Sequence, residues 1–195
     1  LLRGVRLFER DATLWPGLLA GLLFAGEFAL LFAGLQFTTA SRGVIFLYTA
    51  PFVVALGAVW LLPHEHMRRA QWIGMALAFV GVLVLFGENL LQPAGRAWIG
   101  DLMIFVAAVL WAGTTLTVKA TALARVSAEK MLLYQLAVSA LTLPLLSRLL
   151  GESGVFAPTP TVWASLVFQT LAVASMSYLG WFWLMRQDPA PRLRA

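Results

Sequence analysis

The 195-residue sequence contains no cysteine and unusually few charged residues. The missing cysteine excludes disulfides and thiolate metal sites within these residues. Charged residues make up 12% of the composition, whereas an ordinary soluble domain carries about a quarter. The surplus apolar surface is therefore expected to face lipid. In so apolar a chain, we assign the net charge of +5 to basic loops at a membrane surface and expect no nucleic-acid partner.

Several motifs of soluble chemistry are also missing. The sequence has no Gly-x-x-x-x-Gly-Lys-Ser/Thr phosphate loop, no Gly-x-Ser-x-Gly nucleophile elbow and no convincing nucleotide fingerprint. His64-Glu65-His66 lacks the His-Glu-x-x-His spacing that places two imidazoles on one helical face. We therefore expect a solvated loop there, no metal site, no cofactor and no ATP-driven step within this chain.

Hydrophobic residues, by contrast, make up 61% of the sequence. They gather in six stretches long enough to cross a hydrocarbon core, which needs roughly 17–25 helical residues. Their length and continuity favour helices over the shorter alternating strands of a barrel. The predicted fold is an all-α, polytopic membrane helix bundle whose spans are Leu14–Phe37, Val44–Leu62, Gln71–Gly87, Asp101–Val118, Glu129–Ser147 and Thr161–Met185.

The basic residues between these spans predict the orientation. Six spans place eleven basic residues on one side and only Arg42, Arg96 and Arg148 on the other. The positive-inside rule assigns the richer side, and with it both ends of the chain, to the cytoplasm. A high content of Ala, Leu, Gly, Arg and Trp suggests a bacterial source, so we expect the bacterial cytoplasmic (inner) membrane.

A short internal similarity predicts an inverted repeat. Leu31–Ile45 can be aligned with Trp181–Ala195, and the two segments close spans on opposite sides of the membrane. Inverted repeats with an odd number of helices per unit produce this relationship. With a five-helix unit, roughly 50 residues would be missing at each end. The six spans would then be the middle of a ten-helix protein, so we expect the sequence to be a fragment.

The order of these features resembles the EamA half-repeat of the drug/metabolite transporter (DMT) superfamily. Matching positions are Ala40-Ser41, Pro51, Glu65, Gly74 and Gly81, with Leu110-Trp111-Ala112 at the centre of the next half. The Pro63-His64-Glu65-His66 loop departs from the usual Gly-Glu-Arg. The resemblance implies two inverted five-helix halves. Residues 1–95 would hold the last three helices of the first half, and residues 96–195 the first three of the second.

Glu27 is the ionisable residue nearest the middle of a predicted span. A carboxyl in the membrane normally faces a cavity or a partner. It is thus a candidate for binding a solute ammonium group or for exchanging a proton. The alternative is a protonated carboxyl that anchors another helix.

Two prolines are hinge candidates. Pro51 and Pro144 each remove a backbone hydrogen bond, from the carbonyls of Leu47 and Ala140 respectively. Such breaks often lie beside transporter sites, although a static kink is an equal alternative.

Further polar and aromatic side chains are candidates for lining a solute cavity. Hydroxyls that bond their own helix backbone are the commoner outcome at such positions. The candidates besides Glu27 are Tyr48, Phe52, Trp111, Thr114, Thr115, Tyr134, Gln135, Gln169 and Tyr178.

Together these features predict a secondary transporter that moves small organic metabolites, such as amino acids or amines, by alternating access. The resemblance implies that efflux is the common direction. The expected partners are a small-molecule substrate and the lipid bilayer. Two alternatives remain: a membrane scaffold or assembly subunit without transport, and an intramembrane enzyme, which would need paired catalytic groups at one depth.

Overall fold

A computed structural model describes residues 12–61, 68–91, 95–152 and 158–176. Throughout these residues the regular structure is helical. Five spans are long and apolar enough to cross a membrane: Leu14–Gly34, Ala40–Leu61, Arg69–Phe86, Ala97–Ala120 and Lys130–Leu149. They agree with the first five predicted spans. The sixth, 161–185, is described only as far as Met176.

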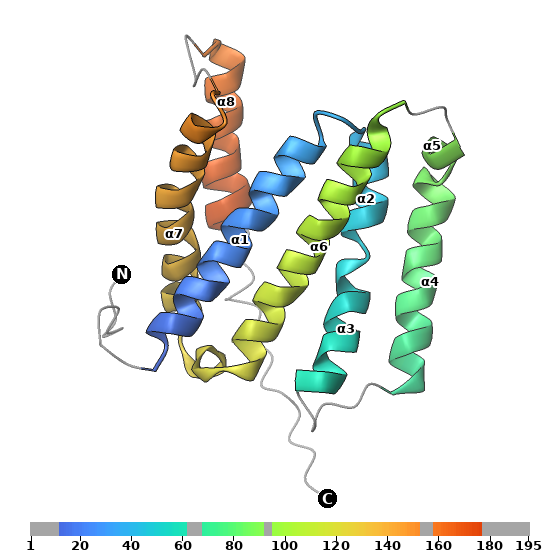
Figure 1. The fold of residues 1–195 in the computed structure, drawn as a ribbon, viewed down its shortest axis with the longest axis horizontal. Helices are drawn as coiled ribbons and strands as arrows, with labels where there is room; N and C mark the ends of the chain where they lie inside the picture. Colours follow the sequence, from blue (N-terminus) through green and yellow to red (C-terminus); the bar gives the residue numbers. More distant parts are fainter. Residues whose placement is uncertain (1–11, 62–67, 92–94, 153–157, 177–195) are drawn as a thin grey trace, which may run out of the picture. The chain divides into compact units, whose positions relative to one another are not determined.

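The chain divides into two compact units, and the division along the sequence falls between Ser147 and Arg148. In the first unit, α6 (Ala97–Ala120) packs against three other helices (Figure 1). These are α1 (Leu14–Gly34), α2 (Ala40–Leu47) and α3 (Ala50–Leu61). Helix α6 is therefore the centre of this unit.

Small residues bring α1 and α6 together. A Cβ atom added to Gly34 would lie 2.9 Å from the Ile104 side chain and 3.0 Å from the carbonyl oxygen of Gly100. Gly26 lies against Leu110 further down the same interface, so the two helices run antiparallel. On α6 the interior positions are alanines with a relative exposure of 0%, namely Ala107, Ala108 and Ala112. Close backbone approach through small residues is a common way for membrane helices to pack.

The second span, predicted over Val44–Leu62 with a lost hydrogen bond at Pro51, is divided into two helices. Helix α2 ends at Leu47 and α3 begins at Ala50. Pro51 lacks the N–H that would bond the Leu47 carbonyl. In the turn between the helices, the Thr49 hydroxyl donates to the Phe46 carbonyl at 2.6 Å. Pro51 thus lies in the first turn of α3, and Ala40-Ser41 form the first turn of α2.

Helix α4 (Arg69–Phe86) has no buried residue among those described. Its start is fixed locally, because the Arg68 backbone N–H donates to the Gln71 side chain at 2.7 Å. A short helix, α5 (Glu88–Leu91), follows. Phe79 of α4 meets Phe52 of α3 edge to face, with ring centres 5.4 Å apart.

Helix α7 (Ala128–Leu149) follows a 3-10 turn, η1 (Ala122–Arg125). Helix α7 packs against two glycines of α1: the Tyr134 ring lies against Gly17, and Val138 lies against Gly21. Pro144 lies within α7 and does not end it.

In the second unit, α8 (Pro160–Phe168) continues as a π-helical segment, η2 (Gln169–Met176). The Thr159 side chain accepts from the Val162 N–H at 3.4 Å. Pro160, as the first helical residue, has a backbone dihedral suited to that position. These two features start the helix at the predicted boundary.

Candidate functional site

Glu27 lies on the face of α1 that packs against α6. It is seven residues from Gly34 and seven from the buried Ala20, so the three residues share one side of the helix. Its relative exposure is 6%. The contacts at Gly26 and Gly34 place it level with the stretch between Ile104 and Leu110, which holds the fully buried Ala107 and Ala108.

One carboxyl oxygen of Glu27 is unsatisfied. Within the described residues, Oε2 is buried and has no hydrogen-bond partner. A buried polar atom that loses its bonds to water without replacement costs roughly 1–3 kcal/mol. The arrangement can therefore accept a hydrogen bond from a solute ammonium or hydroxyl group, or hold a proton.

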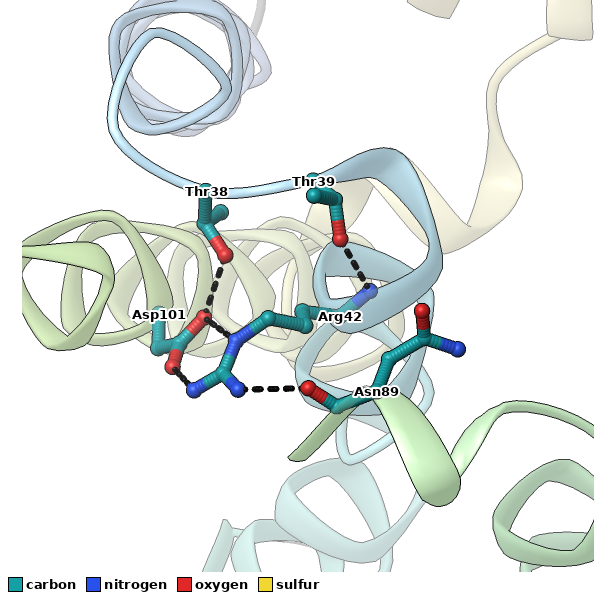
Figure 2. Close-up of polar contacts among 5 residues, drawn as sticks. All are labelled: Thr38, Thr39, Arg42, Asn89 and Asp101. Carbon is teal, nitrogen blue, oxygen red and sulfur yellow. Dashed lines mark hydrogen bonds and ion pairs between the residues drawn. The ribbon is translucent and has the colours of Figure 1, made fainter. Parts of the chain in front are cut away.

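A second polar cluster, the ion-pair network, consists of Thr38, Arg42, Asn89 and Asp101 (Figure 2). It lies at one end of the α1–α6 interface. Arg42 forms an ion pair with Asp101 through Nη2 and Oδ2, and its Nε donates to Asp101 Oδ1 at 3.2 Å. Nη1 donates to the carbonyl oxygen of Asn89 at 2.8 Å. The Thr38 hydroxyl donates to Asp101 Oδ1 at 2.7 Å. The guanidinium thus holds a carboxylate with two nitrogens, the geometry of a strong charge-assisted pair.

Local structure positions both charges of the ion-pair network. Arg42 lies in the first turn of α2, where Thr39 caps the helix by accepting from the Arg42 N–H at 3.4 Å. Helix α6 begins at Ala97, one turn before the predicted start, so Asp101 lies inside the helix rather than at its boundary. Side-chain exposures of 12% for Arg42 and 8% for Asp101 show that the pair is largely shielded from solvent.

The ion-pair network and Glu27 belong to the same interface. Thr38 follows four residues after Gly34, and Asp101 precedes Ile104 by three. Gly34 is seven residues beyond Glu27, which is about 10 Å along a helix axis. The network therefore lies at one end of the interface in which the Glu27 carboxyl is buried.

The two aromatic candidates of the second span lie on either side of its break. Tyr48 directly follows α2 and is 53% exposed. Phe52 lies in α3, against Phe79.

The candidates on α6 diverge as well. Trp111 is 44% exposed, whereas Thr114 is buried. The hydroxyls of Thr114 and Thr115 donate to the carbonyls of Leu110 and Trp111, at 3.1 and 3.2 Å. This is the backbone-bonding alternative that the sequence left open, and their part in solute binding stays a prediction.

The remaining candidates are spread over other elements. The Tyr134 hydroxyl lies 3.2 Å from the Thr13 hydroxyl, which joins α7 to the start of α1. Gln135 is half-buried on α7, and Gln169 is exposed in the second unit. Tyr178 and the His64–His66 loop lie outside the described residues.

The pairing of Arg42 with Asp101 was not predicted. From the sequence, Arg42 was interpreted as a loop charge and Asp101 as the boundary of a helix. A usable signal was present, because both residues begin spans that start on the same predicted side of the membrane. Opposite charges at the same end of two spans are candidates for pairing.

Comparison with known proteins agrees with this architecture. Residues 1–87 match the EamA-like transporter family. Two Bacillus subtilis (strain 168) proteins, each named an uncharacterized transporter (YoaV and YyaM), are similar to the chain. Identity to YoaV is 26% over 88% of this chain and 58% of that protein. Identity to YyaM is 26% over 78% of this chain and 50% of that protein.

The chain thus spans about half the length of these relatives. No solved structure matches it significantly. The five spans among the described residues that are long and apolar enough to cross a membrane, together with the family match, indicate an integral, multi-pass membrane protein. The resemblance noted in the sequence is confirmed for residues 1–87, which match the EamA-like transporter family.

Proposed function

We propose that this chain is part of a secondary transporter that moves small organic metabolites, such as amino acids or amines, across the membrane. The observation that carries the proposal is Glu27, a carboxyl buried at the α1–α6 interface with one oxygen unpartnered among the described residues. An ionisable group within a membrane span is expensive to maintain, and such groups commonly mark transport pathways. The names of the two relatives and the family match support the same class of function.

The whole protein would consist of ten helices in two inverted halves, with residues 1–95 and 96–195 on either side of the division. Helices α1 and α6 then belong to different halves, so Glu27 faces the boundary between them. Solute sites of inverted-repeat transporters lie near the bilayer midplane at such a boundary. We further propose the bacterial inner membrane, cytoplasmic ends for the chain, and efflux as the direction.

Flux measurements test this proposal. The full-length protein is reconstituted into liposomes, and counterflow of labelled amino acids and amines is measured for wild type and Glu27→Gln. Glutamine keeps the size of the side chain but cannot ionise. The expected result is flux for wild type and loss of most of it in the variant, at equal protein incorporation. Glu88→Gln, which makes the same change at an exposed position, is the matched control.

Two results would count against the proposal. Equal flux for wild type and Glu27→Gln would remove Glu27 from the solute pathway. An absence of flux for every solute, from protein that remains folded in the liposomes, would instead favour a scaffold or assembly subunit.

A further inference from the structure

The ion-pair network joins parts of the chain that the proposed repeat assigns to different halves. Arg42 and Thr38 belong to residues 1–95, and Asp101 belongs to residues 96–195. Asn89, also in the first part, accepts the third guanidinium bond. The bonds between Asp101 and its two partners therefore cross the proposed boundary.

We propose that this network is a gate. It closes one end of the α1–α6 interface, and the Arg42–Asp101 pair must separate before water or solute reaches Glu27 from that end. The inference rests on the proposed transport function and adds the residues that control access to its site.

The packing beneath the network supports a closed state. Ile104, one turn below Asp101, has a relative exposure of 0%. A Cβ atom added to either Gly34 or Gly43 would lie 2.9 Å from the Ile104 side chain. The Ile104 side chain thus fills the space where α1, α2 and α6 meet. Access to Glu27 from this end requires α1 to move away from α6. The bonds of the ion-pair network cross the interface at which the two helices would separate.

The chemistry of the network suits a contact that opens and closes. A two-nitrogen bond between guanidinium and carboxylate is strong while it is shielded from water. The guanidinium of Arg42 and the carboxylate of Asp101 are also well hydrated once exposed, and both residues lie at the ends of spans rather than at the membrane centre. Apolar packing alone would not provide such a reversible bond, because water cannot replace its contacts.

Thiol labelling tests the gate without a transported solute. These 195 residues contain no cysteine, so Ile104→Cys introduces a single thiol into this part of the chain. Any cysteine elsewhere in the full-length protein is first replaced by serine. The labelling rate by a membrane-impermeant maleimide is measured in vesicles, with reagent added to each face in turn. Arg42→Gln or Asp101→Asn is then added to the Ile104→Cys protein.

We expect either single substitution to speed labelling about tenfold, since it removes one partner of a shielded pair. Arg96→Gln and Glu88→Gln make matching charge changes at exposed positions and should leave the rate unchanged. The charge swap Arg42→Asp with Asp101→Arg should return the rate toward that of the Ile104→Cys protein.

The proposal fails if Arg42→Gln and Asp101→Asn label at the rate of the two controls, or if the charge swap labels as fast as the single variants. Should a single variant elute as aggregate, Arg42→Lys takes its place. Lysine keeps the charge but loses the two-nitrogen geometry, so an intermediate rate is expected, and a rate equal to the controls would again overturn the gate.

The two proposals fail in different ways. A wild-type protein that transports nothing contradicts the proposed function, while the labelling rates still report whether the ion pair holds the interface closed. Unchanged labelling rates in a protein that does transport contradict the gate alone.

Discussion

Gly34 of α1 and Gly100 of α6 meet backbone to backbone. A Cβ atom placed on Gly100 would overlap the carbonyl oxygen of Gly34. This contact lies between Glu27 and the ion-pair network along the same interface. It fixes how closely the two helices approach, and it leads to the first prediction.

Gly100→Ala should destabilise the protein by about 1–3 kcal/mol, because the added methyl group forces apart two backbones that cannot rearrange. The measurement is the apparent melting temperature in detergent, by fluorescence-detected size exclusion. Gly74→Ala on α4 is the control, since nothing among the described residues lies within 4 Å of its added Cβ. It should be neutral or slightly stabilising, as alanine favours helix over glycine. Equal melting temperatures for the two variants would contradict the packing.

Thr38→Val should lower stability by about 1–2 kcal/mol, because it removes the 2.7 Å hydrogen bond to Asp101 and leaves a largely buried carboxylate with one fewer donor. The same assay applies. Thr115→Val is the matched control, since within the described residues its hydroxyl bonds only the Trp111 carbonyl of its own helix. A loss at Thr115 as large as that at Thr38 would argue that the network adds no stability.

Glu27→Leu should leave the folded protein equally stable or stabilise it by about 1 kcal/mol, because an apolar side chain of similar volume replaces an unpartnered buried oxygen. Flux should nevertheless be lost. A polar anchor between helices would behave in the opposite way, so a clear fall in melting temperature would support the anchoring alternative. The two measurements, melting temperature and counterflow, are made on the same preparation.

Pro144→Ala should raise the melting temperature, because alanine supplies the N–H that the Ala140 carbonyl lacks within α7. If the proline is a hinge, the rate of counterflow should fall at the same time. Unchanged flux together with higher stability would identify a static kink. Pro160→Ala is the control: a proline at the first helical position gives up no intrahelical bond, so its replacement should change neither the melting temperature nor the rate of counterflow.

The membrane spans follow from composition, because a hydrocarbon core demands long apolar helices whatever their neighbours. That is why the predicted start of the first span at Leu14 agrees with α1. The break at Tyr48–Thr49 was harder to place. Pro51 predicts a lost hydrogen bond at the Leu47 carbonyl, but not the turn at Thr49, whose hydroxyl donates to the Phe46 carbonyl.

The ion-pair network could not be predicted in the same way. Arg42 and Asp101 are 59 residues apart, and neither shows its partner in its local sequence. Their pairing depends on how α2 and α6 pack, which small residues such as Gly43 set. Glu27 was identifiable from sequence because a lone carboxyl in an apolar run is conspicuous, yet its burial against α6 depends equally on helix packing.

The interruption between α2 and α3 has a consequence for hydration. Lipid tails offer nothing to a carbonyl that lacks a donor, so non-helical backbone at membrane depth must be covered by protein or wetted. The Leu47 carbonyl faces a proline where a donor should be, and Tyr48 beside it is largely uncovered within this part of the chain. We expect ordered water at this turn. The two helical parts of the second span, α2 and α3, would then be dry, and the turn between them would be hydrated.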